Sequence, residues 1–212
     1  MGVTVSKGEL RGTASGVLFM AFFGTLWAYT GIMGLQGWGS PWLLTVALAI
    51  GFLLVLSGFS LIHVSKEFPD GVSSREGNNS RKRKMRKWFN IIFAGEGIAI
   101  GIAIAVCNAV GHTENIPIVI AIIVGLHFLP LARLFRVSIY YYTGILLCVV
   151  PVITWLFIPE TATLSGHELN AYMSAVGLGS ALILWVTSIA IWMTGRRLMG
   201  LVPDQVTNDL TR

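Results

Sequence analysis

Long apolar runs alternate with short polar breaks along the whole chain. The runs cover residues 14–35, 40–64, 88–110, 116–134, 137–158 and 171–193. An apolar run of about 20 residues is long enough to span the hydrocarbon layer of a membrane as a helix. The runs are continuously apolar rather than alternating, which excludes a membrane β-barrel. The pattern predicts an all-α integral membrane protein in which residues 1–212 form a single bundle of six transmembrane helices.

The composition supports a lipid environment. Of the 212 residues, 54% are hydrophobic and only 12% are charged. A soluble domain carries about a quarter charged residues. We therefore expect the lipid bilayer to be the main surrounding of this protein.

The longest polar segment, residues 65–87, separates the second and third predicted spans. Its Gly, Ser, Asn and charged residues predict a mobile loop that ends in a basic cluster. The cluster consists of Arg81, Lys82, Arg83, Lys84, Arg86 and Lys87. Basic residues beside a membrane either fix the topology or bind anionic lipid headgroups or a partner, and both interpretations remain open. Nucleic-acid binding is not expected, because no folded basic domain accompanies the cluster.

The distribution of positive charge gives the predicted orientation. With six spans, all 15 Lys and Arg residues fall on one side of the membrane, together with both termini. Loops rich in Lys and Arg stay in the cytoplasm. We therefore expect a multi-pass protein with cytoplasmic N- and C-termini.

Glu96 is the one carboxylate that lies deep in a predicted span. It follows Trp88 by eight residues and should lie about 12 Å into the membrane. An ionised carboxylate is costly there unless it is protonated, paired or in contact with water. Gly97 and Gly101 form a small-residue ridge beside it, which favours close helix packing within one chain or between two. We expect Glu96 to face protein rather than lipid.

His127 is the expected partner of Glu96. It lies in the next span, about 9 Å from the same membrane face, and a short turn joins the two spans. A Glu–His pair in a dry interior can exchange a proton or hold a cation. It can equally be a polar clasp between two helices, worth about 1 kcal/mol. Arg133 is an alternative counter-ion for Glu96.

Two further polar residues are expected to assist this site. Asn108 lies at the end of the small-residue ridge on the third span. Three successive tyrosines, residues 140–142, begin the fifth span and point around more than half of the helix, so at least one should face inward. We assign Tyr141 to this position.

No enzyme, metal site or cofactor is predicted. The sequence contains no metal-binding cluster, no serine nucleophile elbow and no phosphate-binding glycine loop. His63 and His127 could together suggest haem, but two isolated histidines are weak evidence for axial ligation.

The segment "GLHFLPLARLF", followed by "YYYTG", resembles small bacterial multi-pass proteins of uncharacterised families that carry a Gly/Ala-His-Phe-x-Pro segment. The resemblance covers roughly the third to fifth spans. It implies a bacterial inner-membrane protein without an assigned activity, and no catalytic residue is carried over.

Two functional hypotheses follow. The first is a small proton-linked transporter or permease for a small cation, with Glu96 as the protonated group and His127, Asn108 and Tyr141 as further contacts. The second is a non-transporting interaction, regulatory or immunity-type membrane protein. In that case the basic cluster meets lipid or a partner, and Glu96–His127 is a structural clasp.

Overall fold

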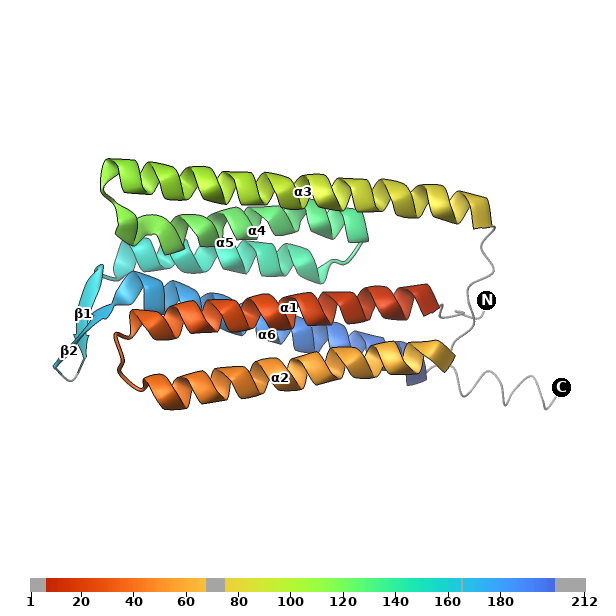
Figure 1. The fold of residues 1–212 in the computed structure, drawn as a ribbon, viewed down its shortest axis with the longest axis horizontal. Helices are drawn as coiled ribbons and strands as arrows, with labels where there is room; N and C mark the ends of the chain where they lie inside the picture. Colours follow the sequence, from red (N-terminus) through yellow and green to blue (C-terminus); the bar gives the residue numbers. More distant parts are fainter. Residues whose placement is uncertain (1–6, 68–74, 165, 201–212) are drawn as a thin grey trace.

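Six long helices dominate the computed structural model, which describes residues 7–67, 75–164 and 166–200 (Figure 1). The helices are α1 (Lys7–Gly34), α2 (Ser40–Val64), α3 (Arg75–Val110), α4 (Ile116–Phe135), α5 (Ile139–Phe157) and α6 (Ala171–Gly200). Two 3₁₀ turns, η1 (Ser65–Glu67) and η2 (Thr113–Asn115), and two strands, β1 (Thr161–Leu164) and β2 (His167–Asn170), complete the described part. All six helices are long and apolar enough to cross a membrane, as the hydrophobic pattern predicts.

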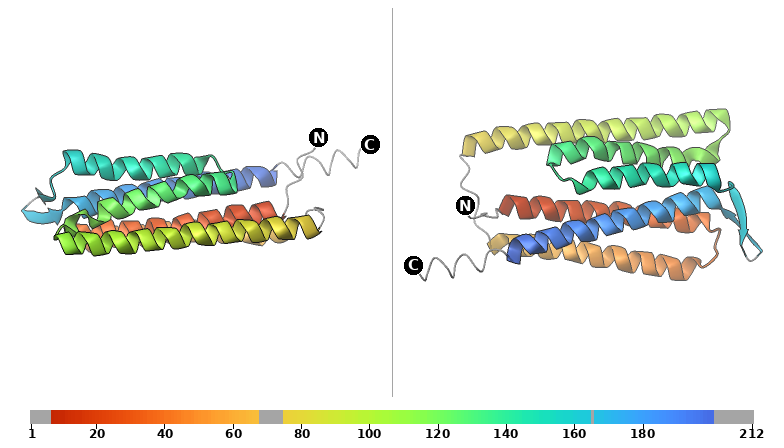
Figure 2. Two further views of the ribbon diagram at one scale, coloured as in Figure 1. Left: turned by 90° about the horizontal axis from the view of Figure 1, so that it is seen from above. Right: turned by 180° about the vertical axis from the view of Figure 1, so that it is seen from behind.

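The helices pack in two groups of three. Helices α1, α2 and α6 form one group, and α3, α4 and α5 form the other (Figures 1 and 2). The groups meet mainly where α6 packs against α5 and α4. At this junction, the Thr143 and Thr187 hydroxyls share a buried hydrogen bond of 2.8 Å.

The tightest contact lies between α1 and α6. A side chain on Gly31 would come within 2.6 Å of the backbone nitrogen of Leu178, and Gly177 faces the Gly31 backbone in the same way. The Ser188 hydroxyl also donates a hydrogen bond of 3.1 Å to the Val17 carbonyl oxygen. Small residues allow this close approach. In lipid the hydrophobic effect does not drive helices together, and van der Waals contacts between closely packed helices stabilise their association instead. We call this contact, centred on Gly31 and Gly177, the α1–α6 seam.

Prolines and left-handed residues set several helix boundaries. Helices α2 and α4 both carry proline in their first turn, where the missing N–H costs no helical hydrogen bond. Helix α4 ends at Phe135, and the residue that follows, Arg136, has a φ of 57° in the left-handed region and turns the chain toward α5. Helix α6 begins after Asn170, whose Oδ1 accepts a hydrogen bond of 2.8 Å from the Met173 N–H.

Helix α3 corrects the predicted loop over residues 65–87. The helix begins at Arg75, so the basic cluster lies on its first turns and is not part of a mobile loop. Arg, Lys and Met are strong helix formers, and their charge is no obstacle outside the lipid. The 36 residues extend for about 54 Å. The helix therefore projects beyond the nearby ends of α4 and α5 (Figure 1). Residues 65–67 of the predicted loop form η1, and residues 68–74 lie outside the described residues.

The connection between α5 and α6 contains an antiparallel pair of strands that the helical pattern does not predict. Thr161 pairs with Asn170, and Leu164 pairs with His167. Gly166 has a φ of 82°, which a glycine adopts without strain. The hairpin extends past the helices at the end of the bundle opposite to the basic cluster (Figure 1).

Candidate functional site

Glu96 and His127 lie next to each other on neighbouring helices. Helix α3 supplies Glu96 and α4 supplies His127, and Glu96 Oε2 is 3.2 Å from His127 Nδ1. The Glu96 side chain is 12% exposed and the His127 side chain 4% exposed. The turn around η2 makes α3 and α4 antiparallel neighbours, so residues at equal depth meet. The expected proximity of the two groups is therefore observed.

The His127 ring is held mainly by packing. Neither ring nitrogen makes a hydrogen bond of good geometry among the described residues, although the Ile92 backbone and the Glu96 carboxylate both approach the ring. A buried polar group without a partner is costly, and a small shift of the ring would form a good hydrogen bond to the carboxylate. The distance between Glu96 and His127 can consequently become shorter or longer when the pair gains or loses a proton.

A layer of rings lies beside the pair, toward the end of the bundle that carries the basic cluster. His127 packs edge-on against Phe93 at 6.3 Å and against Phe128 at 5.9 Å, measured between ring centroids. Phe93 reaches α1 through Phe19 at 6.4 Å, and Phe128 reaches α5 through Tyr140 at 5.8 Å. These five residues, which we call the aromatic layer, join α1, α3, α4 and α5 on one side of Glu96.

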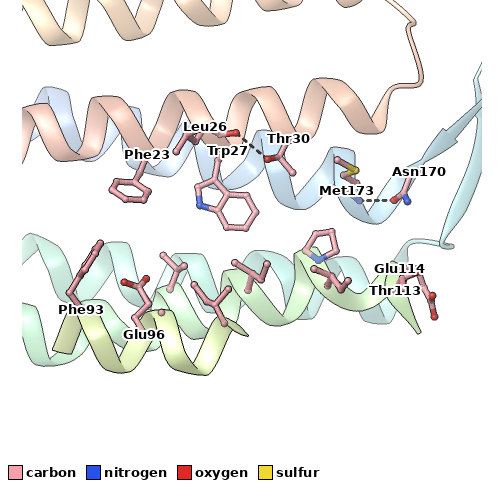
Figure 3. Close-up of a pocket in the computed structure, with 16 residues that line it drawn as sticks. Phe23, Leu26, Trp27, Thr30, Phe93, Glu96, Thr113, Glu114, Asn170 and Met173 are labelled. Atoms are coloured by element: carbon pink, nitrogen blue, oxygen red, sulfur yellow. Dashed lines mark hydrogen bonds between the residues drawn. The ribbon is translucent and has the colours of Figure 1, made fainter. Parts of the chain in front are cut away.

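A cavity of about 510 Å³ lies on the other side of Glu96. Helix α1 forms one wall, and α3 and α4 form the opposite wall (Figure 3). The α1 wall includes Phe23 and Trp27, which face Phe93 and Glu96 (Figure 3). The cavity extends past apolar side chains to Thr113, Glu114 and Asn170 at the end of the bundle that carries the hairpin. The other lining residues are Leu26, Thr30, Gly97, Ile100, Ile116, Pro117, Ile120, Val124 and Met173.

The sequence analysis does not predict that α1 forms a wall of the cavity, because it compares only helices that are consecutive in the chain. A signal is nevertheless present. Phe19, Phe23 and Trp27 are spaced four residues apart and therefore lie on one face of α1. That aromatic stripe faces Glu96, although α1 and α3 are separated in sequence by α2.

Two of the predicted site residues lie away from the cavity. Asn108 is exposed on α3, and its amide donates a hydrogen bond of 2.7 Å to the Ile104 carbonyl oxygen of its own helix. It is about 18 Å along the axis from Glu96 and is rotated by about a third of a turn. Tyr141 is 41% exposed and does not line the cavity. The inward tyrosine is Tyr140, which is 8% exposed and belongs to the aromatic layer.

The remaining basic candidates are outside the cavity. Arg133 is exposed near the end of α4, so His127 and not Arg133 is the group found beside Glu96. In the basic cluster, Arg83, Lys84, Arg86 and Lys87 are exposed on the first turns of α3. Arg81 and Lys82 belong to the same helix, but their side chains lie outside the description.

The small-residue ridge on α3 has no partner helix within the described chain. A side chain added at Gly97 or Gly101 would meet no atom within 4 Å. None of the α3 residues from 83 to 110 is buried. Close packing of helices within one chain is therefore not the role of this ridge.

Six apolar helices of spanning length, with a carboxylate and an imidazole enclosed between two of them, define a multi-pass α-helical membrane protein. Residues 91–194, just under half of the chain, match the model of a family of unknown function (DUF7010). The matched part includes Glu96, His127 and the segment that follows His127. No curated protein and no solved structure matches the chain.

Proposed function

We propose that this protein is a proton-linked transporter for a small cation, with Glu96 as the group that binds either a proton or the substrate. The observation that carries the proposal is the cavity that borders Glu96 and extends to one end of the bundle. A structural clasp between α3 and α4 needs no such opening. An enclosed acid that also reaches a cavity has the accessibility that exchange of a proton requires.

Charge balance at the Glu96–His127 pair explains how binding of a cation is coupled to release of a proton. The pair Glu96–His127 with one proton carries no net charge, whether the proton resides on the carboxyl or on the imidazole. With no proton, the pair carries one negative charge, which one monovalent cation neutralises. Binding of the cation at Glu96 therefore releases one proton, and each form avoids an uncompensated charge in a dry interior.

In the proposed transport cycle, the two helix groups move relative to each other. The cavity lies between α1 of one group and α3 and α4 of the other, and the aromatic layer separates it from the basic end. By the positive-inside rule, the basic end faces the cytoplasm and the cavity opens to the opposite side. A proton and a cation would each stabilise a different packing of the groups, which is the requirement for alternating access.

Reconstituted protein tests this mechanism. Proteoliposomes with an internal pH indicator and an acidic lumen are given Na⁺, K⁺ or benzyltrimethylammonium outside, and loss of internal protons is recorded. At least one of these cations should drive proton release through the parent protein. Glu96→Gln should lower the rate at least tenfold, because the amide cannot exchange a proton. Glu96→Asp should retain part of the rate.

Glu168→Gln is the matched control, because Glu168 is exposed on β2 and does not line the cavity. It should transport like the parent. Equal rates for the parent and the Glu96→Gln variant, or no cation-driven proton flux in the parent, would show the mechanism to be wrong.

The interaction protein remains the second candidate, because α3 exposes Arg83, Lys84, Arg86 and Lys87 as well as its apolar surface. This candidate predicts a different result in the same experiment. Glu96→Gln would lower the stability of the bundle, and no cation would drive proton release from any of the proteoliposomes.

A further inference from the structure

The walls of the cavity indicate which class of cation it can accept, given the transport function proposed above. Three aromatic side chains line it close to Glu96, namely Phe23, Trp27 and Phe93. Trp27 is only 8% exposed, and the face of an indole attracts a desolvated cation more strongly than any other side-chain ring. A cation at Glu96 would therefore meet both a carboxylate and several rings.

Most other polar groups of the cavity already have partners. Thr30 Oγ1 donates a hydrogen bond of 3.1 Å to the Leu26 carbonyl oxygen, and Asn170 Oδ1 accepts one of 2.8 Å from Met173 N. Glu114 Oε1 lies 2.7 Å from His112 Nδ1. The carboxylate of Glu96 is thus the main polar group offered to a ligand deep in the cavity. A sugar or another densely polar ligand would leave its own groups unsatisfied there.

A bare inorganic cation fits poorly for a related reason. Hard cations are bound by several oxygen ligands at once, and a single carboxylate among rings and aliphatic side chains cannot replace a hydration shell. An organic cation has no such requirement, because its charge is spread over carbon-bound substituents that contact apolar walls. The volume of about 510 Å³ lies within the range typical of small-molecule pockets.

The charge along the cavity has the sign that attracts a cation. Glu114 lines its outer end, and Glu160 lies at the start of the neighbouring connection between α5 and α6. No Lys or Arg occurs between residues 88 and 132 or between residues 137 and 195. A low-dielectric cleft lined by one sign of charge raises the local concentration of ligands of the opposite sign.

We propose that the substrate is an organic cation with an apolar body, bound with its charge at Glu96 and its body against Phe23 and Trp27. It enters from the end of the bundle that carries Glu114 and stops at the aromatic layer. Trp27 is a specificity-determining residue, because it favours cations over neutral or anionic molecules of the same shape.

Two probes of nearly the same shape and opposite charge test this assignment. Tetraphenylphosphonium and tetraphenylborate are titrated into the purified full-length protein in detergent, and the dissociation constants are measured by calorimetry. The cation should bind at least tenfold more tightly than the anion. Trp27→Leu should weaken binding of the cation about tenfold. Trp27→Phe, which keeps an aromatic face, should weaken it less and provides a variant with a milder effect on folding.

Trp42→Leu is the control, because Trp42 is 77% exposed on α2 and does not line the cavity. It should bind the cation like the parent, and thermal unfolding of each variant verifies that it is folded. Equal binding of the two probes, or unchanged cation binding in folded Trp27→Leu and Trp27→Phe, would overturn the proposed substrate class.

The result can be separated from that of the transport experiment. If Na⁺ or K⁺ drives proton release while tetraphenylphosphonium does not bind at the cavity, transport stands and the substrate class is wrong. If tetraphenylphosphonium binds as expected while no cation drives proton release, the binding site stands and the transport function is wrong.

Discussion

Two sets of glycines in this protein have similar chemistry and opposite surroundings. Gly31 and Gly177 meet at the α1–α6 seam, where the two backbones touch and an added side chain has no space. Gly97 and Gly101 lie on α3, where an added side chain would meet no atom within 4 Å. A small residue in a membrane helix therefore permits close packing but does not cause it. The partner helix must also present a small surface at the same depth, as α6 does for α1.

The same contrast separates α6 from α3. Half of the residues in the most apolar stretch of α6 are buried, whereas none is buried in the corresponding stretch of α3. Helix α6 packs closely against α1, and α3 is attached mainly through α4. Glu96 lies on the loosely attached helix, which is where a group that must change its contacts is expected.

Gly177→Leu should have the largest effect on stability, because its side chain would occupy the position of the Gly31 backbone. The backbone cannot yield without separating α1 from α6. We expect a loss of about 3 kcal/mol or more in the free energy of unfolding. Chemical unfolding in mixed detergent micelles, followed by tryptophan fluorescence, measures this loss. A variant as stable as the parent would show that the seam is not closely packed.

The hydrogen bond between Thr143 and Thr187 should have an intermediate effect, because it is a buried polar contact between the two helix groups. Each hydroxyl also lies within hydrogen-bond distance of a carbonyl oxygen of its own helix, so the hydroxyl that donates its single proton across the junction can donate it to that carbonyl when its partner is removed. A double-mutant cycle with Thr143→Val and Thr187→Val should give a coupling energy of about 0.6 kcal/mol. A coupling energy near zero would mean that the groups are held together by apolar packing alone.

Gly101→Leu should have the smallest effect, since its side chain points into open surroundings. The free energy of unfolding should change by less than about 1 kcal/mol, because leucine favours the helix over glycine and no packing contact is lost. The measurement is the same as for Gly177→Leu, with sedimentation in detergent added. A large destabilisation together with a lower molecular mass would reveal that α3 packs against a second copy of the chain.

The sequence alone predicts the helices well and the cavity poorly. In lipid, apolar length identifies each span, and consecutive antiparallel helices place Glu96 and His127 at equal depth. That the two side chains also face each other is shown by the structure and does not follow from depth alone. The cavity wall on α1 depends on which non-consecutive helices meet. Periodicity carries little information about this, since membrane helices are apolar on most faces. Asn108 was misplaced for the same reason, because it is as polar as a site residue but lies on the open side of α3.

The predicted loop over residues 65–87 is wrong about the beginning of α3, because a high content of charged residues does not by itself indicate irregular structure. Lys and Arg are good helix formers, and only burial makes their charge unfavourable. The helix can therefore continue from the apolar span into water without interruption.

This continuity mechanically links the membrane surface to the interior. Arg83, Lys84, Arg86 and Lys87 are on the same uninterrupted helix as Glu96, about two and a half to three and a half turns away. If anionic headgroups bind the basic cluster and shift α3 along its axis by the rise of one residue, Glu96 moves past His127 by about 1.5 Å, because a rigid helix moves as a whole. The lipid composition of the surrounding leaflet would then change the distance between Glu96 and His127, although the lipid headgroups do not contact either residue.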